Sequence, residues 1–146
     1  MPPPFLRLLQ LGPREWQDLL RAQFALLHAQ WRLRREPVGS FVVREAATSE
    51  PASGDAGRAG ELALAVERAA THGAFRPFCL VRAIAIRDLL ARHEIRGSRI
   101  RIGVRREAGE FTAHAWVTWG GAILGDRPEH VARFTEVDDI RVLGRS

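Results

Sequence analysis

Apolar residues recur at intervals of three or four positions along residues 13–35. They include Leu19, Leu20, Phe24, Leu27 and Trp31. Such a period is typical of an amphipathic helix. Pro13 favours the first turn of a helix, and Pro37 cannot continue one, so we predict a helix over Pro13–Arg35. We expect it to pack on a core or bind a partner, and a membrane-surface helix is an alternative.

Residues 38–60 lack this pattern. Residues 38–44 suit a short strand or an extended connection, and residues 45–60 are rich in alanine, glycine and serine. We interpret residues 45–60 as a mobile linker. A helical period resumes over Glu61–Gly73 and again, more strongly, after Cys79, where it ends near His93.

From residue 99 the period changes from helical to alternating. Apolar residues occupy every second position in "RIRIGV" and "FTAHAWVTW", and "AILGD" follows after Gly120-Gly121. These segments predict three successive antiparallel strands. The fold class is therefore α+β, with helices followed by a small antiparallel sheet. We divide the chain into an N-terminal helical segment (1–44), the linker (45–60) and a catalytic domain (61–146).

Composition narrows the function classes. The net charge is +5, yet all 22 basic residues are arginine and lie spread along 146 residues, so we do not expect nucleic-acid binding. The opening segment does not resemble a signal peptide, and no apolar run is long enough to span a membrane. One cysteine excludes a disulfide framework and fits a reducing compartment. We expect a cytoplasmic protein without a metal or cofactor.

The single cysteine, Cys79, stands at the predicted start of a helix. Unpaired backbone N–H groups and the positive end of the helix dipole stabilise a thiolate there. The same N–H groups would also form part of an oxyanion hole. The alternative is that Cys79 is a small buried apolar residue.

A nucleophilic cysteine needs a base, and His114 is the best placed of the five histidines. It lies in the middle of a predicted strand between two alanines, which leave room around its ring. A purely structural histidine is the alternative. The other four lie on helical segments or in a polar loop; they are His28, His72, His93 and His130.

The base needs an orienting acceptor, for which Asp126 is the first candidate. The chain has no asparagine, and all its glutamines lie at or before position 30. Glu129, Asp138 and Asp139 are alternatives. A two-residue turn at Gly120-Gly121 would place Asp126 and His114 on opposite faces of the sheet. We therefore expect a three-residue loop or a bulge, which would put them opposite each other.

The order Cys79, His114, Asp126 resembles the transglutaminase-like core, which is related in plan to papain-like enzymes. More narrowly, "CLVRAIAIRDLLARHEIRGSRIRIGV", "FTAHAWV" and "ILGD" resemble the leader peptidases of lasso-peptide biosynthesis, over about Phe75 to Phe134. The resemblance implies that Cys79 attacks the peptide carbonyl, His114 transfers protons and Asp126 orients the imidazole. It implies a cysteine peptidase that removes the leader of a precursor peptide.

The resemblance also implies partners. The segment before residue 61 is too short for a leader-recognition domain, so we expect a separate leader-recognition protein. We expect the helix over Pro13–Arg35 to bind this protein. The alternative is that the helix only packs on the core. An asparagine-synthetase-like macrolactam cyclase would act next. Three rival functions remain: a transglutaminase-like acyl transferase, a non-catalytic binding domain and an arginine-rich RNA-binding protein.

Overall fold

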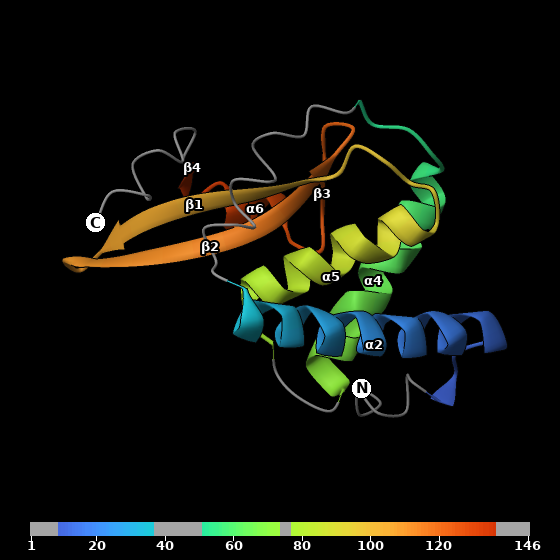
Figure 1. Cartoon of the computed structure of the whole chain (residues 1–146). Coiled ribbons are helices and arrows are strands. Elements are labelled where there is room, and N and C mark those ends of the chain that lie inside the picture. Colours follow the sequence, from blue (N-terminus) through green and yellow to red (C-terminus); the bar gives the residue numbers. More distant parts are fainter. Residues whose placement is uncertain (1–8, 37–50, 74–76, 137–146) are drawn as a thin grey trace.

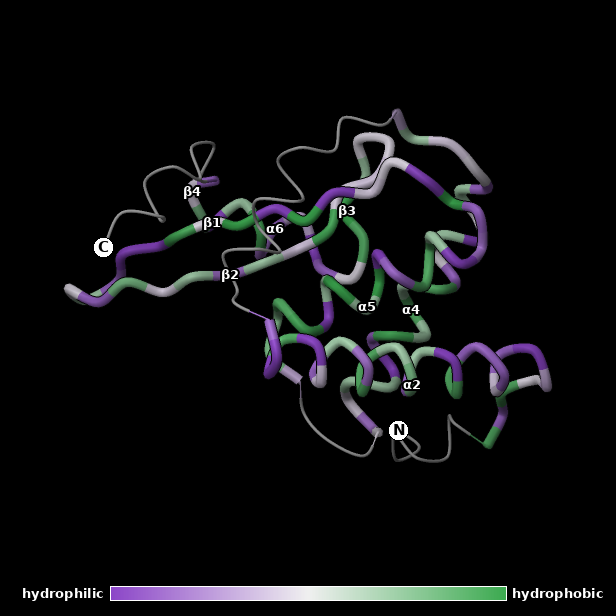
Figure 2. The backbone as a smooth tube through the Cα atoms, viewed as in Figure 1, coloured by the Kyte–Doolittle hydropathy of each residue, from purple (hydrophilic) through white to green (hydrophobic). Residues whose placement is uncertain are grey.

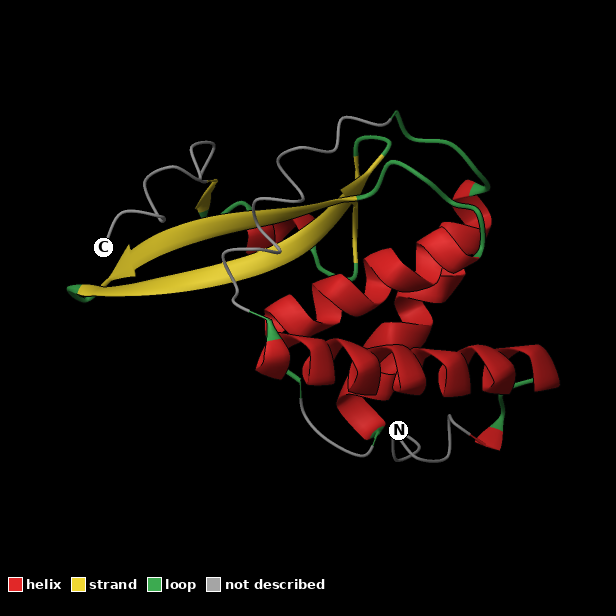
Figure 3. Cartoon of the chain, viewed as in Figure 1, coloured by secondary structure: helices red, strands yellow, loops and turns green. Residues whose placement is uncertain are grey.

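The computed structural model describes residues 9–36, 51–73 and 77–136. Its chain order runs α2 (Pro13–Arg35), α4 (Ala56–His72), α5 (Cys79–Arg92), β1 (Arg99–Glu107), β2 (Glu110–Trp119), β3 (Ala122–Leu124), α6 (Pro128–Val131) and β4 (Thr135–Glu136). The sheet is antiparallel, with strand order β3-β2-β1-β4. The predicted α+β class, with helices followed by a small sheet, is confirmed (Figure 3).

The three long helices lie together on one side of the sheet, and α5 lies between β2 and α2 (Figure 1). Their buried residues form one hydrophobic core with Ala115 and Val117 of β2. The described part of the N-terminal segment therefore shares its core with the elements that follow it.

The predicted bounds of α2 are confirmed, but of its predicted apolar face only Leu19 packs against the core. The buried face carries small residues, namely Ala22, Ala25 and Ala29, together with Leu26. Phe24 is 68% exposed and Leu20 is 58% exposed. Alanines let helix axes approach closely, so α2 packs through its small side chains and leaves large ones outside.

The predicted linker is wrong for residues 56–60, because α4 begins at Ala56 rather than at Glu61. Asp55 caps the helix by accepting a hydrogen bond from the N–H of Arg58 at 3.1 Å. Ser53, just before it, exchanges two backbone hydrogen bonds of 2.9 Å with Arg96. Residues 38–50, which include the predicted extended segment, lie outside the described residues.

A buried ion pair joins α2 to α4. Asp18 is 4% exposed and accepts two hydrogen bonds from the Arg58 guanidinium, at 2.6 and 2.7 Å. These hydrogen bonds hold the pKa of the Asp18 carboxyl below its usual value and raise the pKa of Arg58. A paired arginine explains why an alanine-rich and glycine-rich segment is held as a helix against α2.

Candidate functional site

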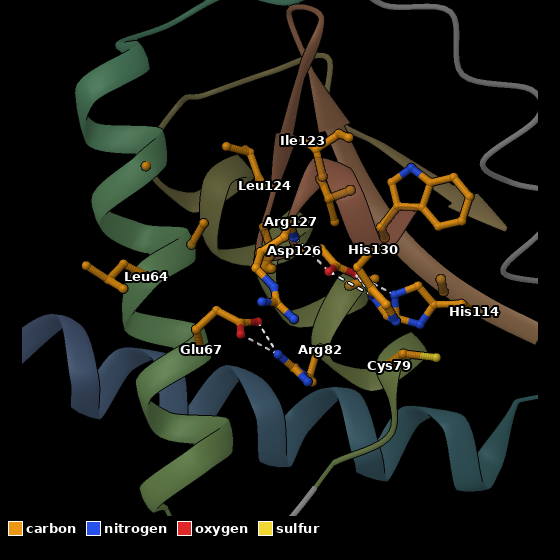
Figure 4. Close-up of a pocket in the computed structure, with 18 residues that line it drawn as sticks. Leu64, Glu67, Cys79, Arg82, His114, Ile123, Leu124, Asp126, Arg127 and His130 are labelled. Carbon is orange, nitrogen blue, oxygen red and sulfur yellow. Dashed lines mark hydrogen bonds and ion pairs between the residues drawn. The ribbon is translucent and has the colours of Figure 1, made fainter. Parts of the chain in front are cut away.

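A pocket of about 650 Å³ opens between α4, α5, the end of β2 and the segment after β3 (Figure 4). Cys79, His114 and Asp126 all line it. The structure therefore brings the three residues selected from the sequence to one cavity.

Cys79 is the first residue of α5. The residue before it, Phe78, has an extended backbone (φ −67°, ψ 160°) and caps the helix without a side-chain hydrogen bond. Among bonds between described residues, the first N–H of this turn to pair is that of Arg82, which donates to the Phe78 carbonyl at 3.1 Å. The N–H groups of Cys79 and its next neighbours precede that bond, as helix geometry requires, and are available to an anion at the helix start.

The ring of His114 is fixed by aromatic side chains. It stacks on Trp116 and on Phe134, with centroid distances of 6.0 and 5.0 Å. Gly103 of β1 pairs with His114 across the sheet, and a Cβ there would come within 2.7 Å of Trp116 and 2.8 Å of Phe134. The missing side chain of Gly103 therefore makes room for the two rings that orient the imidazole.

Asp126 accepts a hydrogen bond from Nε2 of His114. No other hydrogen bond to the His114 ring occurs within the described residues, so Nδ1 is the nitrogen left to exchange a proton with a thiol or a substrate. Cys79 forms no hydrogen bond with this ring in the described part of the chain. Such contacts are often long before a substrate binds.

Asp126 reaches His114 by a route that we predicted wrongly. The turn at Gly120-Gly121 is a two-residue turn, in which Trp119 pairs with Ala122 and both glycines have positive φ, 54° and 80°. The expected three-residue loop is absent at this turn. Instead, β3 ends at Leu124, and Gly125 turns the chain at φ 75°, which frees Asp126 from the alternation of the strand.

A second histidine, His130, was predicted to lie in a loop but shares this carboxylate. His130 lies in α6 and its Nδ1 is 3.0 Å from Oδ1 of Asp126, while the N–H of Arg127 donates to the same oxygen at 2.7 Å. Burial raises the pKa of Asp126, but the hydrogen bonds from His114, Arg127 and His130 outweigh it and hold the pKa below its usual value. The four-residue spacing after Asp126, with Pro128 at a helix start, was a signal for His130.

The remaining candidates lie elsewhere. His93 caps α5 with its Nδ1 2.9 Å from the Leu89 carbonyl oxygen, and His28 stacks on Trp31 on α2. His72 and Glu129 are exposed. Asp138 and Asp139 lie outside the described residues.

The pocket also holds charged and apolar groups that we did not single out. Arg82 of α5 and Glu67 of α4 form an ion pair beside Cys79 (Figure 4). Leu64, Ile123 and Leu124 supply apolar surface. These groups give the cavity the mixed walls that hold an extended peptide or another polar chain.

His114, Asp126 and His130 also offer donor atoms within 4.8 Å of one another. Their mutual hydrogen bonds account for this closeness without an ion. The geometry thus fits proton transfer through a histidine held by a carboxylate, beside a thiol at a helix start.

A protein-family model described as the transglutaminase-like superfamily matches residues 23–138. The match includes the whole pocket and the C-terminal part of α2. No curated protein and no solved structure matches the chain significantly. In the described residues, every helix is too short or too polar to cross a bilayer.

Proposed function

The chain belongs to the transglutaminase-like superfamily, and on that premise we propose that it is a cysteine peptidase that removes the leader from a lasso-peptide precursor. The observation that carries the proposal is the hydrogen bond from His114 Nε2 to Asp126 in a pocket also lined by Cys79. The narrower assignment rests on the sequence resemblance over about Phe75 to Phe134.

In the first half of the reaction, the Cys79 sulfur attacks the scissile carbonyl carbon, and His114 takes the thiol proton on Nδ1. The carbonyl oxygen becomes an oxyanion, which the N–H groups at the start of α5 stabilise. When the intermediate collapses, the C–N bond breaks and His114 gives its proton to the leaving amine. The leader remains attached to Cys79 as a thioester.

In the second half, a water molecule attacks the thioester carbonyl while His114 takes one of its protons. The C–S bond then breaks, the leader leaves with a free carboxyl group, and the thiolate regains a proton from His114. Asp126, which stays ionised because its pKa is lowered, keeps the imidazole in one orientation and stabilises its charged form.

The same proposal assigns the partners. A separate protein would hold the leader, and an asparagine-synthetase-like cyclase would use the amine that the cleavage releases. Both belong to the resemblance and would be found in the cytoplasm.

The test is cleavage of a precursor peptide, with its recognition protein present, followed by mass spectrometry. We expect two fragments whose masses sum to that of the precursor plus one water, and no fragments with Cys79→Ala. The matched control is Cys79→Ser, which keeps the shape of the side chain and should lose nearly all activity as well.

Three outcomes would overturn the proposal. An amine adduct in place of hydrolysis would identify an acyl transferase. Cleavage by Cys79→Ala near the wild-type rate would exclude the cysteine mechanism. Failure of Cys79 to react with iodoacetamide near neutral pH would favour a binding domain.

A further inference from the structure

Five large apolar residues form an exposed row along α2, which we call the outer stripe. Trp16, Leu20, Phe24, Leu27 and Trp31 are 39%, 58%, 68%, 45% and 51% exposed. Two tryptophans and a phenylalanine on one short surface exceed the scattered apolar residues of an ordinary protein surface. The exposure of the outer stripe therefore indicates either a binding partner or a helix that is only loosely attached to the core.

A loosely attached helix does not explain the stripe. The opposite face of α2 is buried in the core, and α2 is held by the Asp18–Arg58 pair and by Arg32, which donates to Asp88 at 3.0 Å. Figures 1 and 2 show α2 at the edge of the helical layer farthest from the sheet. The stripe is thus presented outward on a fixed support.

The spacing along the stripe fits another helix. The intervals are four, four, three and four residues, and the last three are those of a coiled-coil seam. At a rise of 1.5 Å per residue the stripe is about 22 Å long, and it covers roughly 80° of the helix circumference. A seam this narrow suits one helix, whereas a helix lying on a membrane buries a wider face.

Within the described residues of α2, the charged side chains nearest the stripe are arginines. Arg21, Arg34 and Arg35 flank it, and Arg35 lies 4.6 Å from the centroid of the Trp31 ring. The acidic residues of α2 point elsewhere, since Asp18 is buried and Glu15 binds the N–H of Gly12 at 2.8 Å. A second copy packed antiparallel about Phe24 would place Arg34 against Arg14 of the other chain, so charge opposes self-association.

We propose that the outer stripe binds an amphipathic helix of another protein, with apolar residues at its seam and acidic residues on both sides of it. No residue of α2 lines the pocket that contains Cys79, so the partner would dock without covering the pocket. The proposal does not depend on the chemistry proposed for Cys79.

The experiment uses the full chain and two designed helical peptides with identical leucine seams of about three heptads. One peptide carries glutamate at the flanking positions and the other carries lysine. We expect the glutamate peptide to bind at least tenfold more tightly in calorimetry, to shift tryptophan emission to the blue, and to weaken as salt is raised.

Variants locate the binding. Phe24→Ser with Leu27→Ser should weaken binding of the glutamate peptide at least tenfold, whereas Phe111→Ser, at a residue 73% exposed on β2, should not. Arg34→Glu with Arg35→Glu should reverse the preference between the peptides, whereas Arg92→Glu should leave it unchanged. Because these side chains are exposed, thermal unfolding should stay near wild type and serves as the folding check.

Four results would overturn the proposal. These are equal or undetectable binding of the two peptides, unchanged binding by the Phe24/Leu27 variant, a dimer in sedimentation equilibrium that this variant abolishes, and binding to phosphatidylserine vesicles without binding to the glutamate peptide. The third result would assign the stripe to a second copy, and the fourth to a membrane.

Discussion

Asp18 and Asp126 are both shielded carboxylates with lowered pKa values, yet their surroundings differ in one chemical respect. Asp18 joins α2 to α4 through the guanidinium of Arg58, a group that stays protonated at any ordinary pH. Asp126 is held by His114, His130 and a backbone N–H. Histidine loses and gains its proton near neutral pH.

The difference separates a structural pair from a chemical one. An aspartate paired with arginine exchanges no proton at ordinary pH, so the pair serves only to stabilise the contact between two helices. An aspartate paired with histidine fixes a ring that can still carry a proton to and from a reacting group. The following predictions test whether the two sites can be separated in this way.

The largest effect is expected at the histidine that Asp126 orients. His114→Ala should slow precursor cleavage by about 10³-fold or more, because the thiol loses the group that takes its proton. The Cys79→Ala, His114→Ala double variant should be no slower than either single variant, since members of such a unit do not act additively. His72→Ala, outside the pocket, is the matched control. Additive losses would mean that His114 acts separately.

At the Asp18–Arg58 pair, a substitution should reduce the stability of the fold rather than the rate of cleavage. Asp18→Ala should lower the free energy of unfolding by about 3 kcal/mol, because it leaves a largely buried guanidinium without its main partner. Urea unfolding measures this. Glu61→Ala, which removes the exposed partner of the same arginine, should cost less than about 1 kcal/mol. Equal losses in both variants would contradict a buried pair.

Asp126→Asn should reduce the cleavage rate by about 10²-fold, with little change in stability. A serine enzyme loses ~10⁴-fold from the same change, largely through the wrong histidine tautomer, and a cysteine thiolate depends less on its base. Glu129→Gln, at an exposed residue three positions after Asp126, should leave the rate unchanged. A larger effect at Glu129 would reassign the acceptor.

The smallest expected effect is the loss of the stability contributed by Asp18 at acidic pH. The folded-state pKa of Asp18 lies below its unfolded value of about 3.9, so its contribution to stability is present above that value and is lost as the pH falls through the folded pKa. The stability gap between the wild type and Asp18→Ala should therefore narrow below about pH 4, by at most about 1.4 kcal/mol per pH unit. Urea unfolding between pH 5 and pH 3 would show it, and a constant gap would contradict the lowered pKa.

Local signals in the sequence predicted the long helices and the first three strands, but not α6 or β4. Proline and arginine fixed the ends of α2, and the change of period at residue 99 located the sheet. The start of α4 was missed because glycine and alanine indicate flexibility locally, whereas the contact of Arg58 with Asp18 is forty residues away in sequence. Similarly, periodicity identified one row of large apolar residues on α2, and the row of alanines that packs against the core was not recognised.

At the candidate site, residue types pointed to Cys79, His114 and Asp126, and the structure places all three at one pocket. The alternation of residues along the strands could not predict the path of the chain to Asp126, because this path depends on the backbone conformation of Gly125, the residue after β3. Trp116, Phe134 and His130 were missed as a group, since their common contact is the ring of His114.

Gly125 has a consequence for how the site tolerates insertions and deletions. Its positive φ of 75° strains any residue with a side chain, and a Cβ there would lie 2.4 Å from the end of the Ile86 side chain on α5, so the position favours glycine. The carboxylate of Asp126 therefore follows a turn of fixed backbone conformation and is not part of a strand. Insertions or deletions in the hairpin that change the strand register would exchange the faces of β3, yet the acceptor could be restored by compensating changes of loop length downstream of it. The strand register of the hairpin and the position of the acceptor are thus set by separate parts of the chain, which meet at Gly125.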